Sequence, residues 1–188
     1  MKNTKTPILV TLHGGCFTGG SHLWDQKQTK CLEKLGFNVR QLAFPTDNFE
    51  DTIVFLKNAI QEFGKKVYLL GRSSGGYLAK VIFDSCPDLI EKAIYLAPVF
   101  DPETRAMENP RFQKKQSYYF LNTTSYPTTD SFDLEKEVLF LAEKDENVPL
   151  KCFTQTQLEN AIRLGIQTHC GLLQTTSSAF RDQILQVV

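Results

Sequence analysis

The sequence lacks an excess of charge of either sign. Lysine and arginine together number 21, as do aspartate and glutamate, so the formal net charge at pH 7 is zero. Nucleic-acid-binding domains usually carry a surplus of basic residues on one face. We therefore expect no nucleic-acid partner. A chain of 188 residues is long enough for one domain, residues 1–188, with a single core.

Long apolar runs and paired cysteine motifs are also missing. The first apolar run, residues 7–12, is shorter than the apolar region of a secretory signal and much shorter than a membrane-spanning helix. The five cysteines include no Cys-x-x-Cys pair, which favours reduced thiols over disulfides or a zinc site. These observations predict a cytoplasmic protein with no membrane span, no metal and no other cofactor.

Apolar runs alternate with helical patterns along most of the chain. The runs that we interpret as strands are residues 8–12, 39–44, 66–70, 92–96, 138–142 and 166–170. The patterns that we interpret as the main helices are residues 48–63, 75–83, 150–164 and 179–188. Alternating strands and helices predict a mostly parallel six-stranded sheet with helices on both faces, an α/β fold of three layers (α/β/α). The apolar character of most strands agrees with burial on both faces.

One long segment departs from this alternation. Residues 98–132 show no clear period and are rich in aromatic side chains. An irregular insertion of this length in a compact domain often covers a site. We interpret it as a short lid-like insertion, and the alternative is that it packs over the edge of the sheet.

A glycine-rich turn carries the clearest chemical signal. The sequence Gly-Arg-Ser-Ser-Gly at residues 71–75 follows the apolar run 67–70 and precedes an apolar helical segment. Gly-x-Ser-x-Gly between a strand and a helix is typical of a nucleophile elbow, which holds a serine on a strained turn with its hydroxyl exposed. A β-carbon on Gly71 or Gly75 would obstruct the close packing of strand and helix. Ser73 is therefore the candidate nucleophile, and an ordinary glycine-rich turn is the alternative.

A serine nucleophile needs donors for the developing oxyanion. The sequence His-Gly-Gly-Cys-Phe begins at residue 13, where the first predicted strand ends, at the sheet edge where open α/β sheets bind ligands. We expect the backbone amides of Gly15 or Cys16, together with that of Ser74, to form the oxyanion hole. His13 precedes the serine, so we assign it a structural role in bracing this loop.

The serine also needs a base that is held by a carboxylate. Asp145 lies just past the predicted strand 138–142 and is our candidate acid, with Glu143 as the reserve. Of the three histidines, only His169 follows Asp145, in the order serine, acid, histidine typical of this elbow. Two alternatives remain for His169. It can reach Ser73 if the last strand ends early, or it is a structural residue inside that strand.

With elbow, oxyanion loop and acid in this order, the chain resembles the α/β-hydrolase superfamily along nearly its whole length. It is most similar to small single-domain serine hydrolases such as the retinoblastoma-binding serine hydrolase group, through Ser-His-Leu-Trp at residues 21–24 and Leu-Gly-Phe-Asn-Val at residues 35–39. The resemblance implies a minimal α/β-hydrolase fold with strand order 2-1-3-4-5-6. It also implies an acyl-enzyme mechanism with Ser73 as nucleophile and Asp145 as acid.

The resemblance does not supply a base. These hydrolases usually carry a Gly-His pair in the last loop, where this chain has Leu172 in one alignment and Ser177 or Ser178 in another. Three hypotheses follow. The chain is a serine hydrolase of small-molecule carboxylic esters or thioesters, or a binding or regulatory protein with an incomplete triad, or an interaction module that binds a protein partner through the aromatic residues of 117–132.

Overall fold

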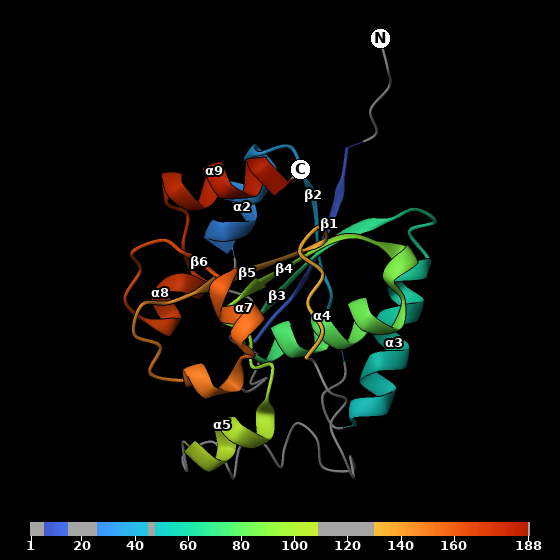
Figure 1. Cartoon of the computed structure of the whole chain (residues 1–188). Coiled ribbons are helices and arrows are strands. Elements are labelled where there is room, and N and C mark those ends of the chain that lie inside the picture. Colours follow the sequence, from blue (N-terminus) through green and yellow to red (C-terminus); the bar gives the residue numbers. More distant parts are fainter. Residues whose placement is uncertain (1–5, 15–25, 45–47, 109–129, 188) are drawn as a thin grey trace.

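Six parallel strands form one sheet at the centre of the molecule (Figure 1). The computed structural model describes residues 6–14, 26–44, 48–108 and 130–187. The strands are β1 (Ile8–Leu12), β2 (Asn38–Gln41), β3 (Val67–Arg72), β4 (Ile90–Leu96), β5 (Glu137–Leu141) and β6 (Ile162–Arg163). Their order across the sheet is β2-β1-β3-β4-β5-β6, and all five strand pairs are parallel. The predicted fold class and strand order are confirmed.

Helices cover both faces of the sheet (Figure 1). Two of them, α3 (Phe49–Gln61) and α4 (Ser74–Ser85), cover one face, and α2 (Gln26–Lys34), α8 (His169–Leu173) and α9 (Ser178–Val187) cover the other. The predicted helix 48–63 corresponds to α3. Its buried side chains recur at helical spacing, and the Asn48 side chain accepts a hydrogen bond from the Asp51 amide at the helix start.

The core therefore consists of two apolar clusters, one on each side of the sheet. In β3, Leu69 belongs to the cluster beneath α3 and α4, and its neighbour Leu70 belongs to the cluster beneath α2, α8 and α9. Both leucines are fully buried. Successive side chains of a strand point to opposite faces, so burial on both faces explains why the strands are continuously apolar.

The sequence-based assignment was wrong between residues 150 and 170. The predicted helix 150–164 is instead a 3-10 turn, η3 (Leu150–Cys152), a short helix α7 (Gln155–Glu159) and the strand β6. The predicted strand 166–170 is absent. Thr154 begins a new helix through a capping box with Gln157. Thr168 caps α8 by accepting a hydrogen bond from the Gly171 amide, so His169 starts a helix and does not end a strand.

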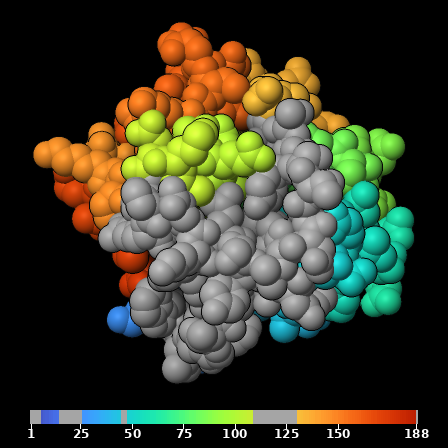
Figure 2. Space-filling view, turned by 90° about the horizontal axis from the view of Figure 1, so that it is seen from below, coloured from blue at the N-terminus to red at the C-terminus, as the bar shows by residue number. Residues whose placement is uncertain are grey.

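The predicted lid-like insertion is described only in part. Its first portion forms α5 (Pro102–Glu108), and residues 109–129 lie outside the described residues. Helix α5 lies beside the segment that follows β5, as the yellow-green and orange atoms of Figure 2 show. Arg105 Nε donates to the Asn147 carbonyl oxygen at 3.1 Å, and Lys151 forms a 2.8 Å ion pair with Glu108. Within the described ranges, no helix is long and apolar enough to cross a membrane.

Candidate active site

Ser73 occupies a strained turn between β3 and α4. Its backbone angles are φ 52° and ψ −119°, in a region that residues other than glycine rarely adopt. The Ser73 amide donates to the Leu96 carbonyl at 2.9 Å, and the Ser73 carbonyl accepts from the amides of Gly76 at 2.9 Å and Val99 at 3.1 Å. These three hydrogen bonds hold the strained conformation in place.

Glycine is required on both sides of the serine. A β-carbon on Gly71 would lie 2.5 Å from the Gly75 carbonyl oxygen, and one on Gly75 would overlap the His13 carbonyl oxygen. Both contacts involve backbone atoms, which cannot rotate away as a side chain can. The packing argument made from the sequence is therefore confirmed. The expectation of an exposed serine was wrong, because Ser73 is only 4% exposed and the His169 ring lies against it.

The structure brings Ser73, His169 and Asp145 into one hydrogen-bonded chain. His169 Nε2 lies 3.1 Å from Ser73 Oγ, and His169 Nδ1 lies 2.7 Å from Asp145 Oδ2. In the tautomer with its proton on Nδ1, the ring donates to the Asp145 carboxylate and Nε2 can accept from the serine hydroxyl. The side chains of His169 and Asp145 are each 6% exposed, so the hydrogen bonds between these residues are shielded from water.

Local hydrogen bonds orient the Asp145 carboxylate. Its Oδ1 atom accepts from the amides of Asn147 and Val148, each at 2.8 Å, and its Oδ2 atom faces the histidine. Glu143, the reserve acid, is exposed, and its backbone amide donates to the Ile166 carbonyl at 2.8 Å. Of the two candidate acids, Asp145 is therefore the one that contacts His169.

His169 reaches the serine from the first position of α8. A carboxylate that the sequence analysis did not consider also contacts this residue, because Glu146 Oε2 accepts from the His169 amide at 3.1 Å. The adjacent residues Asp145 and Glu146 thus bind the ring and the backbone of the same histidine. The signal available in the sequence was the acidic pair itself, which follows the predicted strand 138–142 after Glu143 and Lys144.

The candidate oxyanion donors are described in part. Ser74 is the first residue of α4, where backbone amides have no partner within the helix and can face a ligand. Gly15 and Cys16 lie outside the described residues. His13 is 9% exposed, and its ring stacks on Phe44 with centroids 4.6 Å apart and an interplanar angle of 12°. This contact agrees with the structural role expected for His13.

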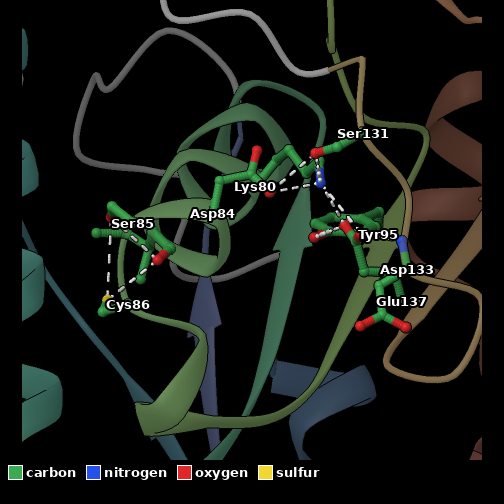
Figure 3. A network of polar contacts seen from close by, with 9 residues as sticks. Lys80, Asp84, Ser85, Cys86, Tyr95, Ser131, Asp133 and Glu137 are labelled. Atoms are coloured by element: carbon green, nitrogen blue, oxygen red, sulfur yellow. Dashed lines mark hydrogen bonds and ion pairs between the residues drawn. The ribbon is translucent and has the colours of Figure 1, made fainter.

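A second buried polar cluster surrounds Lys80 on α4 (Figure 3). The Lys80 ammonium lies 2.7 Å from Asp84 Oδ1, 2.9 Å from Glu137 Oε1 and 3.2 Å from Ser131 Oγ. Tyr95 donates to Glu137 at 2.6 Å. Burial raises the pKa of Glu137 above its ordinary value, and burial together with the Glu137 charge raises that of Tyr95. The cluster holds paired charges and no strained nucleophile.

The residues that the structure describes form no candidate metal site. Among the residues that the structure describes, no three histidine, cysteine, aspartate or glutamate side chains are grouped so that they could hold a metal ion.

Comparisons with known proteins give matches at the level of structure. No family model matches the sequence, and no curated protein matches it. Polyneuridine aldehyde esterase superposes with a TM-score of 0.70 at 17% identity, covering 97% of this chain and 99% of that chain. MGS-MChE2, an α/β hydrolase from a lagoon-sediment metagenome (Mar Chica, Morocco), gives 0.70 at 16% identity, covering 97% and 90%. Est1E from Butyrivibrio proteoclasticus gives 0.65 at 17%, covering 97% and 88%. The chain therefore has the α/β-hydrolase fold.

Proposed function

We propose that this protein is a serine hydrolase that cleaves carboxylic ester or thioester bonds through an acyl-enzyme on Ser73. The observation that carries the proposal is the continuous chain from Ser73 Oγ through His169 to Asp145, with distances of 3.1 and 2.7 Å. Nucleophile, base and acid on one hydrogen-bonded chain are the arrangement that activates a serine hydroxyl.

In the proposed first step, Ser73 Oγ attacks the carbonyl carbon while His169 Nε2 takes the hydroxyl proton. Asp145 stabilises the imidazolium that forms. The tetrahedral intermediate then collapses, and His169 returns the proton to the leaving alcohol or thiol. In the second step His169 deprotonates a water that attacks the acyl-enzyme, and Ser73 is released with its proton restored.

Backbone amides would stabilise the oxyanion. The Ser74 amide at the start of α4 is one proposed donor, and that of Gly15 or Cys16 is the second. Such donors act where negative charge develops on the carbonyl oxygen, and losing one typically costs about 10²- to 10³-fold in kcat.

The proposed substrate class follows from the similar structures and from the aromatic segment. One similar structure is named as polyneuridine aldehyde esterase and another as an α/β-hydrolase enzyme, and we extend only the ester bond type to this chain. The aromatic segment 98–132 would supply an apolar acyl pocket. In its described part, Phe100 is buried and packs edge-on against Tyr95 and Phe153. We also propose a cytoplasmic location; Cys31, Cys86, Cys152 and Cys170 are free thiols.

The alternative of a non-catalytic hydrolase fold rested on a missing base. A histidine 3.1 Å from Ser73 Oγ removes that reason to prefer it. We keep the resemblance to the retinoblastoma-binding serine hydrolase group as a sequence-based prediction.

A fluorophosphonate probe tests the proposal, because it reacts with serines whose hydroxyl is activated. Wild-type protein should be labelled at Ser73 and should hydrolyse p-nitrophenyl acetate, and a Ser73→Ala variant should do neither. Ser85→Ala is the matched control, since Ser85 is exposed at the far end of α4 and, among the described residues, bonds only to Ile82 and Cys86, and it should retain labelling. Absence of labelling in folded wild-type protein would contradict the proposal.

A further inference from the structure

A buried glutamine joins the two elements that carry the serine and the histidine. Gln28 lies on α2 and is 1% exposed. Its Oε1 atom accepts from Arg72 Nε at 2.7 Å, and its Nε2 atom donates to the Thr175 carbonyl oxygen at 2.9 Å. Arg72 immediately precedes Ser73, and Thr175 follows α8, which begins at His169.

The chemistry of these partners fixes the orientation of the amide. A guanidinium only donates and a carbonyl oxygen only accepts, so Gln28 must present its oxygen to Arg72 and its nitrogen to Thr175. Turning the amide by 180° would set two donors against each other at one end and two acceptors at the other. A carboxylate could serve Arg72 only, and an apolar side chain could serve neither partner.

Both ends of this bridge are rigidly connected to the reacting groups. Arg72 is the last residue of β3 and is 2% exposed, and the next residue is the strained Ser73. The Thr175 amide donates to the Leu172 carbonyl of α8 at 3.2 Å, and Leu172 is fully buried. A displacement of Thr175 relative to Arg72 would therefore move α8, and with it His169, relative to the serine.

We propose that Gln28 is a positioning residue that sets the distance between His169 Nε2 and Ser73 Oγ. It acts just beyond the end of α8, whereas Asp145 and Glu146 bind the ring and the amide of His169 at the beginning of this helix. The short α8 is thus held at its beginning by two carboxylates and at its end by one amide. This inference rests on the proposed function, because a positioned base matters only where a proton is transferred.

Proton transfer makes activity a sensitive measure of this distance. It needs heavy atoms about 3 Å apart or a single bridging water, and a displacement of about 1 Å in an active site can cost about 10²-fold in rate. Substrate binding depends less on the histidine position. Loss of the bridge should therefore lower kcat and leave KM nearly unchanged.

The test compares Gln28→Met with Gln41→Met. Gln41 is exposed and also donates to α2, through Thr29 Oγ1 at 2.7 Å, but its side chain forms no hydrogen bond with β3 or α8 among the described residues. Per folded molecule, Gln28→Met should lower kcat for p-nitrophenyl acetate and the rate of fluorophosphonate labelling by about 10- to 100-fold, with KM within about threefold. Gln41→Met should change neither rate. Equal rates for both variants would overturn the proposal.

Two further measurements keep the test decisive. If Gln28→Met fails to fold, Gln28→Glu, which retains the Arg72 contact, should lower kcat in the same way, and wild-type kcat in that variant would overturn the proposal. If wild-type protein shows no labelling, the proposed function fails. The chemical shifts of the His169 ring protons, measured by nuclear magnetic resonance, then test separately whether Gln28 positions His169. Gln28→Met should shift these signals and Gln41→Met should not, and unshifted signals in both variants would overturn the positioning role by themselves.

Discussion

Two buried polar clusters lie along α4, and they differ in what their geometry can do. At the start of the helix, Ser73 is held at φ 52° and contacts His169, which contacts Asp145. Two turns further along, Lys80 is fully buried and paired with Asp84 and Glu137. Both clusters bury ionisable groups. Only the first places a candidate nucleophile, a candidate base and a candidate acid on one series of hydrogen bonds that starts at a strained backbone position.

The difference shows that buried ionisable groups do not by themselves indicate a catalytic site. In the Lys80 cluster, burial raises the pKa values of Tyr95 and Glu137 above their ordinary values. Structural ion pairs perturb pKa values as active sites do. The Lys80 cluster connects α4 to β4, β5 and the segment before β5, which gives it a clear structural purpose.

The largest expected effect is the loss of activity when one of the hydrogen-bonded residues Ser73, His169 and Asp145 is replaced. Ser73→Ala and His169→Ala should each lower kcat for p-nitrophenyl acetate by about 10⁴-fold or more, because such residues act as a unit. The free energy of unfolding of Ser73→Ala should change by about 1 kcal/mol or less, since one hydrogen bond is lost. Steady-state kinetics and urea unfolding measure the two quantities. Full activity in either variant would remove that residue from the mechanism.

The two candidate acids should differ almost as strongly. Asp145→Asn should lower kcat by about 10⁴-fold, because an amide cannot fix the histidine tautomer or stabilise the imidazolium as a carboxylate does. Glu143→Gln should leave kcat within about twofold, since that side chain is exposed. The comparison uses the same ester assay. The reverse ranking would move the acid to Glu143.

The Lys80 cluster should show the opposite pattern, with an effect on stability and none on chemistry. Lys80→Met leaves Glu137 buried without its ammonium partner, which should cost about 3–5 kcal/mol of unfolding free energy. The double variant Lys80→Met with Glu137→Gln removes both charges and should regain part of that loss. Activity per folded molecule should stay at the wild-type value in both variants. A fall in kcat without a fall in stability would assign the cluster a role in catalysis.

The smallest expected effect is a pH dependence of stability that comes from Glu137. Burial raises the pKa of this carboxyl in the folded protein above its ordinary value of 4.5. Above pH 4.5 the folded state therefore holds this proton more tightly than the unfolded state, and stability from this group falls as the pH rises through the folded pKa. Glu137→Gln should flatten that part of the curve, with a change in slope below about 1.4 kcal/mol per pH unit. Urea unfolding at half-unit pH intervals measures the slope, and identical slopes would contradict the stated direction.

The sequence alone was informative wherever the structural cause is local. The turn around Ser73 needs glycine at two nearby positions, because backbone atoms of β1 and α4 occupy the space of a β-carbon, and the pattern of small residues shows this need directly. Continuously apolar strands indicated a sheet buried on both faces. Asp145 could be chosen because it follows its strand by a few residues.

Tertiary structure decided the features that depend on residues far apart in the chain. The short elements between residues 150 and 170 have no pattern long enough to distinguish helix from strand, so caps at Thr154 and Thr168 determined them. His169 lies 96 residues from Ser73 in the sequence, and Gln28 lies 147 residues from Thr175. Local sequence constrains backbone geometry through steric contacts between neighbours, but only packing of α8 against the sheet brings His169 within hydrogen-bonding distance of Ser73.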